Sequence, residues 1–226
     1  MKNAKGGKSM LGADVGLIEY SRKVDFGNCI THAIGAVAAA VGFFFLIAKA
    51  QGIRGTVSAV VYGLSILAVY TVSAVYHGLP CGEAKRRARL IDHSTVPVLI
   101  AGTATPCALM TLWNMSVPHT VLVLAIGWGC TLFGIFSKLF FFEKLKKVTV
   151  AVYIVSSVAM LLCAIPFLGR IDGYAFSRLL IGNAFYLLGA IFCAIGRKYP
   201  SMHVVFHVFT VIGSAFHYFV ILLFVL

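Results

Sequence analysis

Long runs of apolar residues, separated by short polar segments, dominate the chain from residue 26 onward. A membrane-spanning helix needs about 20 mostly apolar residues. Seven runs meet this requirement, at residues 26–48, 56–77, 91–112, 119–140, 148–168, 175–195 and 203–225. The runs are continuous rather than alternating, so they do not fit the strands of a membrane barrel. The pattern predicts an all-α polytopic membrane protein, with a segment 1–25 followed by one seven-helix transmembrane domain, 26–226.

The composition supports the same class of protein. The chain has 226 residues, of which 60% are hydrophobic and 12% are charged. A soluble domain averages about 45–50% apolar and about 25% charged residues. Disordered chains have few hydrophobic residues and many charges, so disorder is excluded too. Residues 1–25 contain no apolar stretch of the signal-peptide type, so we expect no cleaved signal and a first span that anchors the chain.

The net charge of +12 comes from Lys and Arg clustered between the apolar runs. This arrangement sets membrane orientation and does not favour nucleic acid as a partner. Fifteen of these cations fall on one side of the predicted spans, namely Lys2, Lys5, Lys8, Arg22, Lys23, Lys85, Arg86, Arg87, Arg89, Lys138, Lys144, Lys146, Lys147, Arg197 and Lys198. Four fall on the other, namely Lys49, Arg54, Arg170 and Arg178. The positive-inside rule therefore predicts a cytoplasmic N-terminus and an outer C-terminus in the inner or plasma membrane, opposite to G-protein-coupled receptors.

Ionisable residues inside spans are rare and usually functional. His77 ends the second predicted span, and Asp92 opens the third. His203 and His207 open the seventh span, while His32 lies near the start of the first. With the predicted topology, all five fall at one membrane depth near the cytoplasmic face. Residues from four separate stretches are therefore expected to meet.

The spacing of the histidines predicts a metal site. His203 and His207 are four residues apart, which puts them on one helix face, and His77 can supply a third imidazole. Three histidines plus water form an open catalytic zinc site. Asp92 can take a proton from that water or accept a hydrogen bond from a ligand N–H, and Ser73 shares a helix face with His77. These residues predict metal-assisted hydrolysis of a lipid amide or ester that enters from the inner leaflet.

Other polar residues are expected to have structural roles. His93 points away from Asp92, and we expect it at the interface or behind the site rather than as a ligand. We expect His119 at the outer interface and a hydrogen bond from His217 to a neighbouring helix. Asn28 and His32 are one turn apart, and a helix-packing role is favoured slightly over substrate contact. The cysteines form no Cys-x-x-Cys pair, so we expect neither disulfides nor a cysteine metal site.

Four motifs together give the chain a family resemblance. They are Asn28-x-x-Thr31-His32-Ala-Ile-Gly35, Ser73-x-x-x-His77, Asp92-His93 leading into AGTATP, and His203-x-x-x-His207 followed by GSAFHY. With these motifs the chain resembles the hemolysin III family, the bacterial branch of the progestin and adiponectin receptor (PAQR) superfamily, from Asn28 to the C-terminus. Two positions depart from the family pattern, Val24-Asp25 in place of paired acids and Gly182-Asn183 in place of a glycine pair.

The resemblance implies the same arrangement on independent grounds. It implies an N-in fold of seven helices and a zinc ion held by His77, His203 and His207 near the cytoplasmic face. It also implies that Asp92 lies close to the metal through water, with Ser73 beside it. The superfamily is similar to alkaline ceramidases, which implies hydrolysis of a lipid amide.

Three functions remain open from the sequence. The first is a zinc-dependent hydrolase with a membrane lipid as substrate. The second is a receptor-like membrane sensor that uses zinc structurally and binds lipid as a ligand. The third is a haemolysin-type pore-forming or membrane-perturbing protein, although no span carries a polar stripe suited to a wide pore. An ion transporter is disfavoured, because only His217 lies near mid-membrane. The sequence does not determine the oligomeric state.

Overall fold

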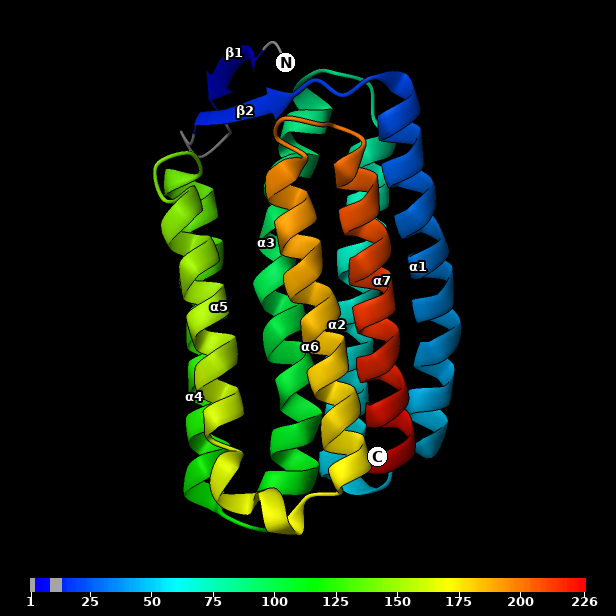
Figure 1. The fold of residues 1–226 in the computed structure, drawn as a ribbon, viewed down its shortest axis with the longest axis vertical. Coiled ribbons are helices and arrows are strands. Elements are labelled where there is room, and N and C mark those ends of the chain that lie inside the picture. The colour runs from blue at the N-terminus through cyan, green and yellow to red at the C-terminus, as the bar shows by residue number, and fades with distance from the viewer. Residues whose placement is uncertain (1–2, 9–13) are drawn as a thin grey trace.

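A computed structural model of the chain describes residues 3–8 and 14–226, so Lys2 and part of the segment 1–25 lie outside it. The described part contains seven α-helices packed side by side as an elongated bundle (Figure 1). A β-hairpin lies across the end of the bundle that carries the N-terminus, and the C-terminus lies at the opposite end (Figure 1). An odd number of helices, each running the length of the bundle, places the two chain ends at opposite ends, as observed.

The observed elements follow the predicted runs with shifted ends. The hairpin consists of β1 (Asn3–Lys8) and β2 (Asp14–Ile18), and the helices are α1 (Arg22–Lys49), α2 (Gly52–Gly78), α3 (Glu83–Pro106), α4 (Val117–Phe141), α5 (Lys146–Leu162), α6 (Gly173–Ile195) and α7 (Met202–Val220). A π-helical segment extends α3 over Cys107–Leu112, and another extends α7 over Ile221–Val225. A 3₁₀ segment, Ile165–Arg170, connects α5 to α6.

Six of these helices are long and apolar enough to cross a membrane, judged by length and composition within the described residues. They are α1, α2, α3, α4, α6 and α7. The remaining helix, α5, has 17 residues and falls short of that length. The structure thus supports an all-α polytopic membrane protein, and the predicted fifth span, 148–168, corresponds to the shorter α5.

The distribution of side chains is that of a protein surrounded by lipid. Large apolar side chains cover the outside of the bundle, for example Phe44, which is 76% exposed, and Val37, which is 67% exposed. Polar side chains are buried inside, among them Asn28, His32 and Ser65. A water-soluble bundle shows the opposite arrangement, because exposed apolar area is unfavourable in water.

The third helix begins well before its apolar run. It starts at Glu83 rather than at residue 91, because the basic segment that precedes the run is also helical. Glu83 pairs with Arg87 one turn later, at 3.2 Å, a spacing that stabilises helices. The apolar run marks the part of a helix suited to lipid, whereas the helix itself continues into the polar region. This extension carries Lys85 and Arg89 into the packed end of the bundle.

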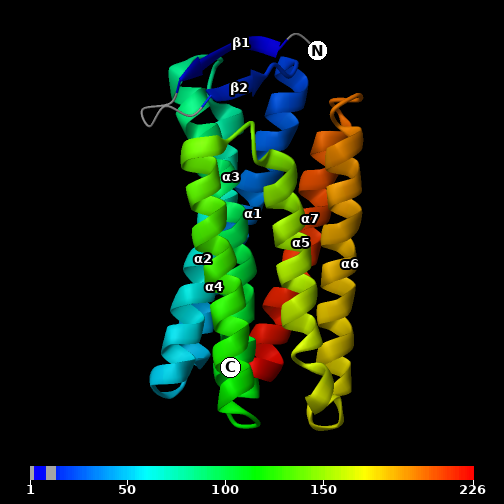
Figure 2. The ribbon, with the colours of Figure 1, turned by 90° about the vertical axis from the view of Figure 1, so that its left-hand side faces the viewer.

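The N-terminal hairpin is an element that the sequence analysis did not predict. Its strands pair antiparallel, with Asn3 opposite Ile18 (Figure 2). Val15 and Leu17 of β2 are both buried, and Val15 packs with Leu90 and Phe142. Alternating apolar residues are the pattern of a half-buried strand, but two such residues are too few to identify one. Contact with the bundle therefore determines this hairpin.

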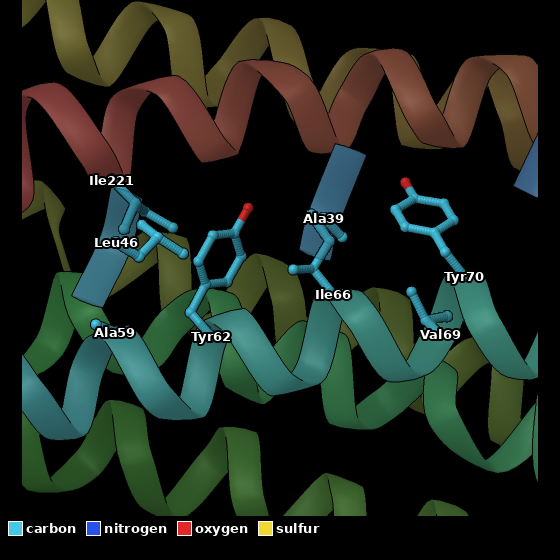
Figure 3. Packing of buried hydrophobic residues seen from close by; sticks show 8 residues of the cluster. All are labelled: Ala39, Leu46, Ala59, Tyr62, Ile66, Val69, Tyr70 and Ile221. Carbon is cyan, nitrogen blue, oxygen red and sulfur yellow. The ribbon is translucent and has the colours of Figure 1, made fainter. Parts of the chain in front are cut away.

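Helix α2 lies at the centre of the largest apolar cluster. Its members are Ala39, Leu46, Ala59, Tyr62, Ile66, Val69, Tyr70 and Ile221, from α1, α2 and the end of α7 (Figure 3). Glycines on α1 allow this close packing: a Cβ on Gly35 would lie 3.0 Å from the Tyr70 ring, and one on Gly42 would lie 2.8 Å from the Tyr218 ring. This packing holds α1, α2 and α7 together.

Candidate metal centre

Three histidines from two distant segments meet inside the end of the bundle that carries the hairpin. His77 is in the last turn of α2, and His203 and His207 lie in the first two turns of α7. One nitrogen of each histidine can be chosen so that all three lie within 4.8 Å of one another. The rings are close as well, with centroids 4.8 Å apart for the pair on α7 and 4.9 Å for His77 and His207. The structure thus brings together the three residues that the sequence analysis selected.

Each of these histidines uses its Nδ1 atom to contact a neighbouring group. Nδ1 of His77 lies 3.0 Å from a carboxylate oxygen of Asp25. Nδ1 of His207 lies 3.3 Å from the backbone carbonyl of Asn28, which can only accept, so this nitrogen carries the hydrogen. Nδ1 of His203 lies 4.0 Å from the sulfur of Cys193. These contacts use Nδ1, which leaves Nε2 as the candidate metal-binding atom, and contacts of this kind at the other nitrogen are typical of metal-binding histidines.

Asp25 connects the histidine cluster to a buried cation. One oxygen accepts from His77 and the other from Lys85 Nζ, at 2.6 Å. The Lys85 side chain is only 1% exposed, so Asp25 provides the negative charge that its burial requires. The side-chain nitrogen of Asn28 also lies 3.3 Å from Nδ1 of His77. Asp25 is not among the site residues predicted from the sequence, although its spacing to Asn28 and His32 places all three on one helix face.

Asp92 lies near the histidines but bonds to a different one. A carboxylate oxygen of Asp92 is 3.2 Å from Nδ1 of His93. The carboxylate is also close enough to His77 and His32 for electrostatic interaction with both. The Nδ1 atom of His77 is bound by Asp25 rather than by Asp92, so Asp92 does not hold this candidate ligand in place. His93 packs against Phe142, with ring centroids 5.3 Å apart.

Ser73 is buried one turn before His77 on α2. Its hydroxyl makes no hydrogen bond with the residues that the structure describes. A buried hydroxyl normally has a partner. Ser73 is therefore available to a water molecule or a ligand beside His77.

Two aromatic groups enclose the cluster. His32 stacks on His207, with centroids 3.7 Å apart and an angle of 20° between the rings, and its Nε2 lies 3.3 Å from the Thr210 hydroxyl. Tyr20 lies between the hairpin and α1, and its ring stacks on His203 with the ring centroids 5.3 Å apart. Burial raises the pKa of the Tyr20 hydroxyl, so the ring is a neutral cover at physiological pH. The cluster is thus shielded from bulk water on the hairpin side.

The remaining histidines and the cysteines lie outside the cluster. His217 donates from Nε2 to the carbonyl of Leu179 on α6 at 3.1 Å, which confirms the predicted bond to a neighbouring helix. His119, in the first turn of α4, bonds to Ser116 at 2.8 Å, and α4 begins at the end of the bundle away from the hairpin (Figure 1). All six cysteines are free, as predicted: Cys29, Cys81, Cys107, Cys130, Cys163 and Cys193.

The donor set fits a zinc ion. Zinc in proteins is bound by imidazole nitrogens at about 2.0–2.1 Å, and three histidines with one open position are a frequent catalytic set. Two nitrogens on one tetrahedral zinc are therefore about 3.4 Å apart. The observed spread of up to 4.8 Å needs only a small movement of the rings toward one another. The bonds at Nδ1 also favour the neutral tautomer that presents Nε2 to a metal.

Comparison with known proteins assigns the chain to a family. The family model described as "Haemolysin-III related" matches residues 20–218. The chain is 35% identical to "Hemolysin-3" of Bacillus cereus over 90% of its own length and 93% of that protein. It is 34% identical to the "Hemolysin-3 homolog" of Bacillus subtilis (strain 168), with 90% and 95% covered. It is 24% identical to the human "Monocyte to macrophage differentiation factor", with 86% and 81% covered, which fits a placement in the PAQR superfamily. The chain therefore belongs to the hemolysin III family of multi-pass membrane proteins.

Proposed function

We propose that the protein binds one zinc ion through His77, His203 and His207 and hydrolyses an amide or ester bond of a membrane lipid. The observation that supports this most directly is the convergence of three histidines, two buried and one partly buried, each of which contacts a group behind it through Nδ1. A zinc ion held in this way would supply Lewis acidity, which lowers the pKa of water at the site to about 7. The other steps of the proposal concern the side chains around the cluster.

The surrounding residues have distinct roles in this proposal. Asp25 orients His77 through Nδ1, and the carbonyl of Asn28 does the same for His207. Asp92, close to His77 but not bonded to it, accepts a proton from water at the cluster. The free hydroxyl of Ser73 binds the polar group of the lipid. Tyr20 covers the cluster and limits the entry of bulk water.

The proposal includes seven membrane crossings with the N-terminus in the cytoplasm. Helix α5 starts at the hairpin end, where α4 finishes, and α6 starts from the opposite end (Figures 1 and 2). Helix α5 has only 17 residues, but the 3₁₀ segment Ile165–Arg170 continues the chain from it toward α6. The surplus of Lys and Arg on the hairpin side supports this orientation, which places the histidine cluster at the inner leaflet.

Elemental analysis of the purified protein tests the metal. We expect about one zinc per chain in the wild type and none in the double variant His203→Ala/His207→Ala. His119→Ala is a matched control, since it removes a histidine at the other end of the bundle and is expected to keep the zinc. Wild-type protein that contains no zinc and takes up none from added zinc would refute the metal centre.

Lipid turnover then separates a catalytic from a structural zinc. Purified protein is incubated with a ceramide and with a fatty acyl ester, and released fatty acid is measured by mass spectrometry. A general base contributes roughly 10²–10⁴-fold to the rate, so Asp92→Asn is expected to lose activity in that range while it keeps zinc. A zinc whose removal lowers thermal stability, in a protein with no lipid turnover, supports the receptor-like sensor instead.

Membrane lysis is a second candidate, favoured by the name "Hemolysin-3" of a relative that is 35% identical. Purified protein added to dye-loaded vesicles of bacterial lipid tests it. Dye release that persists in the His203→Ala/His207→Ala variant would indicate membrane perturbation independent of the metal centre. Release that requires the histidines would connect it to lipid hydrolysis.

A further inference from the structure

A second cluster of charged side chains lies beside the N-terminal hairpin, between α3, α4 and the loop that follows α4. Its centre is the ring of Phe142, which is buried with Val15 and Leu90. The Lys138 ammonium lies 5.0 Å from the centre of this ring, and so does the Arg89 guanidinium. Both cations are largely buried, Lys138 being 4% and Arg89 8% exposed.

Neither cation has the partners that a buried charge requires. Among the side chains that the structure describes, those of residues 15–226, Lys138 contacts the aromatic ring but makes no hydrogen bond or ion pair. Nε of Arg89 is buried without an acceptor, and the carboxylate oxygen paired with its NH1 group, on Glu143, is 3.6 Å away, too far for a hydrogen bond. Lys85 on the same helix is different, because it is bound by Asp25 at 2.6 Å. Burying a charge without a partner is unfavourable, so an acceptor is missing here.

The nearby acids among the described side chains are already occupied. Glu143 is bound by Lys146 at 2.7 Å, and Asp92 is bonded to His93. The lysines of the adjoining loop, Lys144, Lys146 and Lys147, add further positive charge and are exposed. The described side chains of this region therefore carry a surplus of positive charge that their own carboxylates do not balance. An anion that accepts several hydrogen bonds would complete it.

We propose that Arg89 and Lys138 form a binding site for one phosphate group. Arginine and lysine are the side chains that bind phosphate in proteins, and charge-assisted hydrogen bonds make such contacts strong. The site lies at the bundle end where most Lys and Arg gather, the level at which lipid headgroups meet a membrane protein. The phosphate is carried either by an anionic phospholipid or by a free phosphate compound. The site is separate from the histidine cluster and does not depend on zinc.

Binding measurements on delipidated protein in a neutral detergent test the site. The probes are inorganic phosphate, dioctanoyl phosphatidylglycerol and, as a zwitterionic comparison, dioctanoyl phosphatidylcholine. Native mass spectrometry gives the number of bound molecules, and the shift of the thermal unfolding temperature gives the affinity. The variants are Lys138→Met, which removes the charge but keeps the length, Lys138→Arg, which keeps the charge, and Arg89→Gln. Lys147→Met is the matched control, since Lys147 is exposed on the same side of the bundle.

We expect the wild type and Lys147→Met to bind one phosphatidylglycerol more tightly than phosphatidylcholine. Lys138→Met and Arg89→Gln each remove a charge-assisted contact, so each is expected to weaken binding by at least about tenfold. Without lipid, Lys138→Met is expected to unfold at or above the wild-type temperature, because it removes an unpaired buried charge. Stabilisation by inorganic phosphate that competes with the lipid indicates a free phosphate ligand, whereas stabilisation by the lipid alone indicates a headgroup.

Two results would overturn the proposal. One is wild-type protein that does not discriminate between the anionic and the zwitterionic lipid and is not stabilised by phosphate. The other is unchanged affinity in both Lys138→Met and Arg89→Gln. If Lys138→Met does not fold, Arg89→Gln is compared with Lys138→Arg. Only Lys138→Arg keeps the positive charge, so equal affinity of these two variants for phosphatidylglycerol would also overturn the proposal.

Discussion

Replacement of Asp25 by asparagine separates the two roles that the structure gives this carboxylate. One oxygen accepts from Nδ1 of the candidate ligand His77 at 3.0 Å, and the other binds Lys85 at 2.6 Å. The substitution Asp25→Asn keeps the shape of the side chain and removes its charge. It therefore weakens the support of a metal ligand and leaves the Lys85 ammonium, 1% exposed, without a counter-charge.

The expected magnitudes differ for the two roles. Loss of a group that orients a metal-binding histidine costs about 10–100-fold in metal affinity. Loss of one partner of a buried ion pair costs roughly 3–5 kcal/mol of stability. We expect about 3 kcal/mol for Asp25→Asn, because the amide still offers one oxygen to Lys85.

The two effects can be separated with a second substitution. Lys85→Met removes the buried cation without touching His77, so the double variant Asp25→Asn/Lys85→Met has no unpaired charge. We expect the double variant to recover most of the stability in a denaturant titration of the detergent-solubilised protein. Its zinc affinity, measured by competition with a chelator, is expected to stay 10–100-fold below that of the wild type. Wild-type zinc affinity in the double variant would refute the role of Asp25 in orienting His77.

Three further predictions concern packing, pH and the site. Gly182→Ala puts a Cβ 2.4 Å from the buried His217 ring, so we expect the free energy of unfolding to fall by about 1–3 kcal/mol, measured by thermal unfolding. The control Gly129→Ala adds a Cβ that meets nothing within 4 Å and is expected to be near neutral. Burial alone would raise the pKa of Glu143, but its hydrogen bond to Lys146 and the nearby cations outweigh this and lower the pKa below its usual 4.5. The ionised Glu143 therefore stabilises the fold above pH 4.5, and the difference between wild type and Glu143→Gln should vanish as the pH falls through the lowered pKa; a constant difference would contradict this. Ser73→Ala is expected to keep its zinc and lose at least about tenfold in lipid turnover, since it removes an otherwise unbonded hydroxyl; full activity would exclude Ser73 from substrate binding.

Much of the fold was predictable because apolar length is a local property. Each continuous apolar run became a helix, with the ends shifted by a few residues in most cases. The start of α3 was wrong, because hydropathy marks where lipid contact begins and not where helical hydrogen bonds begin. The β-hairpin was missed because its buried residues, Val15 and Leu17, are stabilised by a surface that forms only after the helices pack.

The histidine cluster was predictable from depth and topology together. His77 and the two histidines of α7 fall at one predicted depth, and helices that span the same membrane bring such residues to a common level. The start of the apolar run places Asp25 just before the first predicted span. Its contacts with His77 and Lys85 join residues about 50–60 positions apart, and no local pattern encodes them.

The sequence by itself determined the class of protein, the approximate course of its helices and the three candidate metal ligands, because apolar length and the rarity of intramembrane charge are properties of single segments. Only the tertiary structure decided how the cations at the hairpin end are used. Lys85, Arg89 and Lys138 have the same appearance in the sequence, as positive charges beside apolar runs. Packing gives Lys85 a carboxylate and buries Arg89 and Lys138 around an aromatic ring without hydrogen-bonding partners. The cost of a buried charge depends on which groups surround it in space, and that arrangement exists only in the folded bundle.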